Sequence, residues 1–312
     1  MQPELSIIIP VYNEEDCVLR LEAELVPIVE DTGVPTEVIL VDDGSNDSTA
    51  ELLSEVISRR PWCHVIRLKR NFGQTQAMAA GFDHARGKTL VCLDADLQND
   101  PKDIPRLLEK MNEGYDIVSG WRKNRKDTWL TRRVPSICAN WLISRWLGVR
   151  IHDYGCSLKA YDARIMKALH LYSDMHRFLP ALASQCGARV TEITVNHRPR
   201  LYGESKYGLS RIFKVAADLI VLKLIVDFSN RPSHAFGIIG MFFVLGAFML
   251  LPLFAWNIAV GYRVNTVLPA IMIIFMLCAV NFFVLGVLGD LIVRVGHTDR
   301  TDHARSTAVE LS

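Results

Sequence analysis

The chain has 312 residues, and its 35 basic and 34 acidic side chains give a formal net charge of +1 at pH 7. This length allows one sizeable core or two smaller ones, and the balanced charge gives no sign of a polyanionic partner, so no nucleic-acid partner is expected. Seven cysteines are scattered without a CxxC pair, which indicates reduced thiols in a cytosol-facing protein.

The first 122 residues alternate between short β-branched runs and helical patterns. Strands are predicted at 5–11, 37–42, 64–68, 89–95 and 115–122. Apolar residues at helical spacing predict helices at 47–58, 74–85 and 101–114. This alternation indicates an α/β domain with a doubly wound sheet.

The C-terminal third is apolar. Segment 208–228 mixes apolar stripes with charged residues, which predicts an amphipathic helix lying in a membrane interface. Two apolar runs follow, at about 235–260 and 266–290, and each exceeds the roughly 20 residues needed to cross a bilayer core. The alternative, a pair of buried helices in a soluble core, is disfavoured by runs this long without charge.

Basic residues near the two predicted spans set their orientation. Arg231 precedes the first span, and Arg294, Arg300 and Arg305 follow the second, whereas only Arg263 lies between them. Both termini are therefore expected in the cytoplasm, in a multi-pass protein of the inner or plasma membrane. The predicted organisation is a cytosolic domain at 1–207, a juxtamembrane region at 208–232, two spans within 233–293 and a cytosolic tail at 294–312.

Two carboxylates, Asp94 and Asp96, follow the apolar run LVCL. Ligands of open α/β sheets bind at the carboxyl ends of strands, and adjacent like charges are costly to desolvate unless a cation neutralises them. Oxygen ligands in a cleft favour Mg²⁺ or Mn²⁺ completed by a substrate diphosphate. A solvated turn or a helix N-cap is the structural alternative, but Asp100 before Pro101 already fits the cap position.

Polar side chains also follow the first two predicted strands. Tyr12 and Glu14 come after the first strand, and Asp42 and Asp43 come after the second. Carboxylates accept hydrogen bonds from ribose hydroxyls or base NH groups, and a tyrosine ring can cover a base. These positions indicate a nucleotide site beside the acidic pair.

Six segments occur in order: SIIIPVYNEE, ILVDDGSNDST, NFGQTQAMAAGFDHARG, LDADLQNDP, DYGCSLKAY and YGESKY. Together they resemble family 2 inverting glycosyltransferases of GT-A fold, in the branch of polyprenyl-phosphate sugar transferases that includes bactoprenol glucosyltransferases and dolichol-phosphate mannose synthase. The resemblance covers residues 6 to about 207. It implies a Rossmann-like GT-A fold and transfer of a sugar from a nucleotide sugar to a membrane polyprenyl phosphate. Glucose and UDP are the first expectations, with Mg²⁺ or Mn²⁺ as cofactor.

The resemblance also implies roles for individual residues. The nucleotide sugar would be bound by Pro10, Tyr12, Glu14, Asp42, Asp43, Asp94, Arg200 and Lys206. The metal would be bound by Asp94, Asp96 and Gln98, and the lipid phosphate by Arg122, Arg132 and Ser136. Catalytic roles would fall to Asp96, Arg122, Asp153 and Lys206. Asp153 is expected either to act as a base or to orient a sugar hydroxyl.

Several alternatives stay open at this point. The sugar could be formamido-arabinose, galactose, an N-acetylated sugar or mannose, and Trp121, Tyr154 and Cys156 are candidates to discriminate among sugars. A processive synthase is disfavoured because no QxxRW motif is present. A non-catalytic membrane scaffold is disfavoured by the intact acidic pair. A homo-oligomer is compatible with small residues that permit close packing of the spans, namely Gly237, Gly240 and Gly246.

Overall fold

The structure, a computed structural model, describes residues 2–123, 144–145, 148–149, 151–169, 175–199, 232–260 and 266–307. The chain divides into two compact units, Met1–Asp218 and Leu219–Ser312. The predicted amphipathic helix at 208–228 lies outside the described residues. Four predicted site residues also lie outside them, namely Arg132, Ser136, Arg200 and Lys206.

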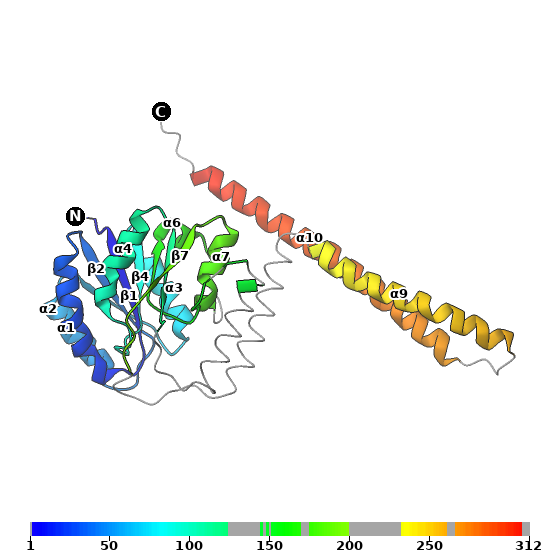
Figure 1. The fold of residues 1–312 in the computed structure, drawn as a ribbon, viewed down its shortest axis with the longest axis horizontal. Helices are drawn as coiled ribbons and strands as arrows, with labels where there is room; N and C mark the ends of the chain where they lie inside the picture. Colours follow the sequence, from blue (N-terminus) through cyan, green and yellow to red (C-terminus); the bar gives the residue numbers. More distant parts are fainter. Residues whose placement is uncertain are drawn as a thin grey trace. The chain divides into compact units, whose positions relative to one another are not determined.

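The first unit contains a seven-stranded sheet in the order β3-β2-β1-β4-β6-β5-β7 (Figure 1). Its strands are β1 (Leu5–Val11), β2 (Thr36–Asp42), β3 (Cys63–Arg67), β4 (Thr89–Cys92), β5 (Ile117–Trp121), β6 (Lys159–Asp162) and β7 (Val190–Thr194). Neighbouring strands are parallel except at β6, which is antiparallel to both β4 and β5. The sheet is therefore mixed, whereas the sequence pattern alone suggested parallel strands.

Helices cover both faces of this sheet (Figure 1). One face packs against α1 (Glu15–Asp31), α2 (Thr49–Arg59) and α4 (Ile104–Asn112). The other packs against α3 (Gln74–His84), α6 (Ala163–Ala168) and α7 (Leu179–Gln185). Short 3-10 turns lie at η1 (Pro101–Asp103) and η3 (Met175–Phe178). In β1, Ile7 and Ile9 face the first helix layer and Ile8 faces the second. Both faces of the strand are therefore buried, which explains why its sequence is one continuous apolar run.

The five predicted strands are confirmed, with ends that shift by a few residues. The fourth ends at Cys92 instead of continuing to residue 95, because the following residues form a loop. Asp100 caps η1 as expected, since its side chain accepts a hydrogen bond from the backbone N–H of Lys102. The elements β6, β7, α6 and α7 were not predicted, and neither was α1, which contains Pro27.

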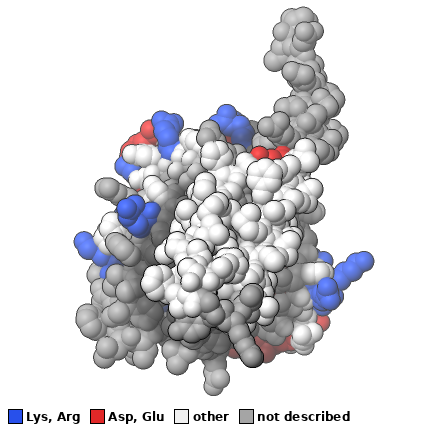
Figure 2. All heavy atoms as spheres, turned by 90° about the vertical axis from the view of Figure 1, so that its right-hand side faces the viewer, with Lys and Arg blue, Asp and Glu red and all other residues white. Residues whose placement is uncertain are grey.

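The second unit is a hairpin of two long helices, α9 (Pro232–Ala259) and α10 (Val267–Thr307). Their apolar parts are Pro232–Ala259 and Val267–Ile292, with mean hydropathies of 2.5 and 2.8, and only 11% of an 18-residue apolar stretch in each is buried. Helices of a soluble core would be mostly buried, so this exposure disfavours that alternative. In Figure 2 the face of the hairpin toward the viewer is almost entirely free of Lys, Arg, Asp and Glu, and within Pro232–Ala259 and Val267–Ile292 the one such residue is Asp290. Both helices are long enough to cross a membrane.

Glycines allow the two long helices to approach each other. A Cβ at Gly240 would lie 3.2 Å from the carbonyl oxygen of Ala279, and one at Gly246 would lie 2.7 Å from the Phe275 ring. Gly237 has nothing within 4 Å, so it does not serve this contact. The expected small-residue packing therefore holds for Gly240 and Gly246 within the hairpin.

Candidate active site

The polar residues predicted for the site follow strands that end at one edge of the sheet. The strands β1, β2 and β4 are parallel, and β5 runs in the same direction because β6 is antiparallel to both β4 and β5. Lys159, at the start of β6, pairs with Cys92 of β4 on one side and Ser119 of β5 on the other. The loops after β1, β2, β4 and β5 and the loop before β6 therefore meet where ligands of such sheets bind.

The acidic pair lies in the loop after β4. Asp96 is 7% exposed, and Asp94 is half-buried. The Asp94 carboxylate accepts a hydrogen bond from Gln74 Nε2 at 2.6 Å and another from Ser157 Oγ at 2.7 Å. Burial, followed by the neighbouring charge of Asp96, raises the pKa of Asp94 above that of an ordinary aspartate. These donors hold the carboxylate without neutralising its charge.

The same loop has an unusual backbone. Leu97 has φ of 60°, a left-handed conformation that costs a non-glycine residue about 1–3 kcal/mol. Its side chain is 3% exposed and packs in the core below, which offsets part of that cost. The turn also lets the backbone N–H of Gln98 donate to Asp96 Oδ1 at 3.2 Å. The loop is thus shaped to keep Asp96 and Gln98 adjacent.

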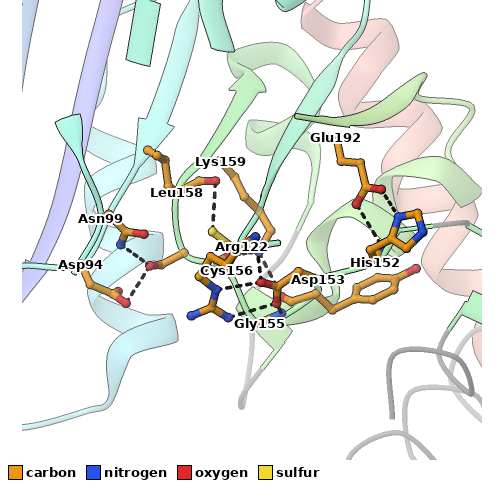
Figure 3. Close-up of polar contacts among 12 residues, drawn as sticks. Asp94, Asn99, Arg122, His152, Asp153, Gly155, Cys156, Leu158, Lys159 and Glu192 are labelled. Carbon is orange, nitrogen blue, oxygen red and sulfur yellow. Dashed lines mark hydrogen bonds and ion pairs between the residues drawn. The ribbon is translucent and has the colours of Figure 1, made fainter. Parts of the chain in front are cut away.

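Arg122, which directly follows β5, forms an ion pair with Asp153, which lies in the loop before β6. Arg122 Nε lies 2.7 Å from Asp153 Oδ2, and Arg122 Nη2 lies 3.0 Å from Oδ1 (Figure 3). Asp153 is 3% exposed and also accepts the Gly155 N–H at 3.1 Å. Burial alone lowers the pKa of Arg122, but the bonds to Asp153 outweigh it, so the pKa lies above the ordinary arginine value. The guanidinium of Arg122 therefore stays charged.

The two acidic residues after β2 are held differently from each other. Asp43, 3% exposed, accepts hydrogen bonds from the backbone N–H groups of Phe72 at 2.8 Å and Gly73 at 2.9 Å. Asp42, 1% exposed, accepts the Ser45 N–H through Oδ1. Its Oδ2 lies 3.2 Å from Arg67 Nε but has no hydrogen-bond partner among the described residues. That oxygen keeps its capacity to accept a hydrogen bond from a ligand.

The loops after β1 and β2 interlock. The Asn13 N–H donates to Ser45 Oγ at 3.0 Å, and the Asn46 N–H donates to Asn13 Oδ1 at 2.9 Å. Gly44, with φ of +72°, allows this turn to approach the chain before α3, because a Cβ there would lie 2.5 Å from the carbonyl carbon of Arg70. The loop that carries Tyr12 and Glu14 is therefore fixed to the loop that carries Asp42 and Asp43, while Pro10 lies within β1.

The three residues proposed to discriminate sugars differ in accessibility. Trp121 is half-buried and stacks on His152 with ring centroids 4.4 Å apart. His152 Nδ1 contacts Glu192 Oε1 (Figure 3). Tyr154 and Cys156 are each 1% exposed, and Tyr154 donates its hydroxyl hydrogen to the carbonyl oxygen of Val149. Contrary to expectation, Tyr154 and Cys156 face the protein interior, which leaves Trp121 as the accessible one of the three.

Comparison with known proteins identifies the family. Residues 6–169 match the model of glycosyl transferase family 2. The chain belongs to that family. This family 2 glycosyltransferase is 40% identical over 303 residues to a dodecaprenyl-phosphate galacturonate synthase of Rhizobium johnstonii, covering 95% of this chain and 89% of the relative. It is 37% identical to an undecaprenyl-phosphate 4-deoxy-4-formamido-L-arabinose transferase of Edwardsiella ictaluri, covering 93% of this chain and 89% of the relative. The resemblance inferred from the six segments is confirmed.

A solved structure confirms the fold of this glycosyltransferase. The glucosyl-3-phosphoglycerate synthase of Mycobacterium tuberculosis, in complex with Mn²⁺, uridine diphosphate and phosphoglyceric acid, superposes with a TM-score of 0.57. The match covers 72% of this chain and 78% of the other at 16% identity, a level that compares folds and not substrates. The Rossmann-like GT-A fold expected from the sequence is therefore correct.

The donor set of this glycosyltransferase can be compared with what a metal requires. Among the described residues there is no cluster of three or more His, Cys, Asp or Glu side chains suited to a metal. Mg²⁺ and Mn²⁺ are commonly held by one or two carboxylates, with water and substrate phosphates supplying the rest. Asp94 and Asp96 provide two carboxylates, and burial followed by the charge of Asp96 raises the pKa of Asp94, a penalty that a bound cation would relieve. The residues therefore fit such an ion.

Four residues near this site had no assigned role in the sequence analysis: Gln74, Asn99, Ser157 and Lys159. Gln74 and Ser157 contact Asp94, although they lie 20 and 63 residues away along the chain. Their segments, NFGQTQ and DYGCSLK, were recognised as family motifs. Only the folded sheet shows which polar side chains within those motifs reach the acidic pair.

Proposed function

We propose that the protein transfers a sugar from a nucleotide sugar, UDP-linked by preference, to a membrane polyprenyl phosphate. The observation that carries the proposal is the meeting of the Asp94–Asp96 pair and the Arg122–Asp153 ion pair at the ligand-binding edge of a GT-A sheet. Two relatives named for transfer to polyprenyl phosphates, which match over more than nine-tenths of this chain, support the substrate class.

The nucleotide would lie against the loops after β1 and β2. Tyr12 would cover the base, while Asp42 and Asp43 would accept hydrogen bonds from base or ribose. The Oδ2 of the buried Asp42 supports this role, because it lies 3.2 Å from Arg67 Nε but accepts no hydrogen bond from the described residues, so it can accept one from a ligand donor. Pro10 and Glu14 complete this side of the site, and Asp94 would face the sugar diphosphate.

The reaction is an in-line displacement at the anomeric carbon. A phosphate oxygen of the lipid forms a bond to that carbon while its bond to the nucleoside diphosphate breaks, with inversion. The attacking phosphate monoester is already anionic at neutral pH because its second pKa is near 6, so no strong base is required. Arg132 and Ser136 would hold that phosphate, and Arg200 and Lys206 would neutralise the departing diphosphate. Catalysis then consists of positioning and charge stabilisation.

The ion pair supports different roles for Arg122 and Asp153. Asp153 accepts hydrogen bonds from four donor groups, which makes it a poor candidate for a free base and supports its role in positioning. Arg122 is held by Asp153 in one orientation, and the fixed guanidinium would help to bind the lipid phosphate. The family-derived assignment of Arg122 to the acceptor phosphate is therefore retained with Asp153 as its support.

A divalent cation, Mg²⁺ or Mn²⁺, would be held by Asp94, Asp96 and Gln98. It would supply charge neutralisation to the leaving diphosphate when bound. Complexes of the structurally similar synthase contain Mn²⁺ or Mg²⁺ together with uridine diphosphate, which supports both the ion and the nucleotide.

The hairpin would anchor the enzyme to its lipid substrate. A polyprenyl tail leaves the bilayer only at about 0.8 kcal/mol per buried CH₂, so the active site must work at the membrane surface. We place α9 and α10 across the inner or plasma membrane, with the catalytic domain and both termini in the cytoplasm. The predicted domain boundaries at 207, 232 and 293 and a homo-oligomeric state are retained as parts of this proposal.

The identity of the sugar requires direct measurement. Glucose was the first expectation, but the two relatives are named for galacturonate and formamido-arabinose. The experiment incubates purified full-length enzyme, in detergent with Mg²⁺ or Mn²⁺, with undecaprenyl phosphate and a panel of UDP- and GDP-linked sugars that includes these three. A lipid-linked sugar detected by mass spectrometry is the expected product. Absence of transfer from every donor would refute the proposal.

A further inference from the structure

The short loop from Asp153 to Ser157 contacts both halves of the candidate site. At its first residue, Asp153 holds Arg122, and at its last residue, Ser157 donates to Asp94 Oδ2 at 2.7 Å. Asn99 Nδ2 donates to Ser157 Oγ at 2.8 Å, which leaves the hydroxyl hydrogen directed to Asp94 (Figure 3). Five consecutive residues thus join the loop after β4 to the end of β5.

A buried lysine holds this loop in place through hydrogen bonds to its backbone carbonyl groups. Lys159 is 2% exposed, and its Nζ donates to the carbonyl oxygen of Tyr154 at 3.1 Å and to that of Cys156 (Figure 3). Gly155 lies between those two carbonyls, and a Cβ there would lie 3.2 Å from Arg122 Nη2. A buried ammonium group must be compensated by hydrogen bonds. Here the compensation comes from the loop itself, so burying Lys159 also defines the path of the loop.

We propose that Ser157 is a positioning residue for Asp94, and that the 153–157 loop, fastened by Lys159, sets the acidic pair and the Arg122–Asp153 pair in one fixed arrangement. This inference rests on the proposed function, in which Asp94 contributes to metal and diphosphate binding. Groups that hydrogen-bond to a ligating carboxylate orient it, and their loss typically lowers metal affinity or activity roughly 10- to 100-fold. Ser157 acts through Asp94 and does not itself touch the substrate.

A matched pair of hydroxyl deletions tests this role. Ser157→Ala removes the hydrogen bond to Asp94, whereas Ser119→Ala removes a fully buried hydroxyl that has no hydrogen-bond partner among the described residues. Full-length protein in detergent is titrated with Mn²⁺ in the presence of UDP, and binding is followed calorimetrically. Ser157→Ala should raise the Mn²⁺ concentration for half-saturation roughly 10- to 100-fold. Ser119→Ala should match the wild type, and Ser157→Thr should restore most of the affinity.

A second pair of measurements separates positioning from general damage. The unfolding temperature of Ser157→Ala should stay close to that of Ser119→Ala, while kcat for sugar transfer falls at saturating Mn²⁺. In Lys159→Met, amide hydrogen exchange at residues 153–157 should accelerate, and half-saturation by Mn²⁺ should rise as in Ser157→Ala. Should Ser157→Ala fail to fold, Asn99→Ala, which removes the donor that orients Ser157, takes its place in the titration.

The outcomes distinguish this inference from the proposed function. Equal Mn²⁺ titrations and equal kcat in Ser157→Ala and Ser119→Ala would overturn the positioning role alone, provided that the wild type transfers sugar. Wild-type protein that neither binds UDP with Mn²⁺ nor transfers a sugar would overturn the proposed function and this inference with it.

Discussion

Glu37 and Asp94 are acidic residues withdrawn from water near opposite edges of the same sheet. Glu37, the second residue of β2, accepts hydrogen bonds from Ser6 Oγ at 2.6 Å and from the Arg86 N–H at 2.7 Å. It also forms an ion pair with the Arg86 side chain. Asp94 is bonded to the neutral donors Gln74 and Ser157 and lies near a second carboxylate, Asp96. The two environments move the two pKa values in opposite directions.

Burial raises the pKa of both groups, so the difference comes from their partners. At Glu37 the hydrogen bonds from Ser6 and Arg86 outweigh burial, and the pKa lies below the ordinary glutamate value. At Asp94 the charge of Asp96 adds to burial, and the pKa lies above the ordinary aspartate value. A carboxylate paired with a cation contributes to stability, whereas two neighbouring carboxylates that repel each other are poised to bind a cation. The comparison therefore separates a structural acid from a functional one.

The largest effect is expected at the edge that carries Asp94 and Asp96. Asp96→Ala should reduce sugar transfer by at least about a hundredfold, because it removes a ligand of the ion that stabilises the leaving diphosphate. Asp96→Asn, which keeps the shape and removes the charge, should lose activity to a similar extent. Both variants should insert into the membrane and unfold at or above the wild-type temperature, since the repulsion on Asp94 is relieved. Turnover rates measured with the preferred donor test this, and wild-type turnover in Asp96→Ala would contradict the assignment.

Binding of metal and nucleotide should stabilise only a protein with an intact acidic pair. With UDP and Mn²⁺ at about one hundred times the dissociation constant, linkage predicts about 2.7 kcal/mol of stabilisation. For a domain of this size that corresponds to an increase in unfolding temperature of roughly 5–10 °C. The shift should disappear with a chelator and in Asp96→Ala, and it should persist in Glu37→Ala. An equal shift in Asp96→Ala would place the ion elsewhere.

The sequence reveals acidic residues at strand ends more readily than their partners. Asp42, Asp94 and Asp96 follow apolar runs that read as buried strands, and such runs are recognisable because both faces of the sheet are covered. Ser157 reaches Asp94 only because β6 returns antiparallel between β4 and β5. No local pattern encodes that pairing, so the partner 63 residues away is not predictable from periodicity.

The missed strands have an identifiable physical reason. In β6, two of the four residues are Lys159 and Asp162, and Lys159 is buried only because loop carbonyls accept its hydrogen bonds. In β7, at the end of the strand order, Thr191 and Glu192 interrupt the apolar residues, and the strand is only partly buried. Strand signals are weakest where a polar residue is buried through tertiary contacts or where an edge is half-exposed. Of the five predicted strands, β1, β2, β4 and β5 lie within the sheet and are mostly buried, whereas β3 is a half-exposed edge strand that its apolar residues Val65 and Ile66 still reveal.

Removing the Glu37 side chain should affect stability and leave catalysis intact. Glu37→Ala leaves the buried Ser6 hydroxyl and the Arg86 N–H without their acceptor, a loss worth about 1–3 kcal/mol. Chemical denaturation of the full-length protein should therefore show a lower free energy of unfolding. Sugar transfer below the unfolding transition should remain within about twofold of wild type, because surface and structural changes away from the site leave the bound geometry unchanged. A large loss of kcat in a folded variant would mean that the two edges are coupled.

The smallest expected effect is the pH dependence of the Glu37 contribution. Its pKa is lower in the folded than in the unfolded protein, so its stabilisation is fully present above the unfolded value, near pH 4. As pH falls through that range and then through the folded pKa, the carboxylate is protonated and the contribution is lost. Glutamine cannot ionise, so the difference in free energy of unfolding between wild type and Glu37→Gln isolates this residue from all other carboxylates. That difference should be constant from pH 7 to pH 5 and shrink below about pH 4. A difference independent of pH would show that hydrogen bonding alone, without the charge, accounts for the stabilisation.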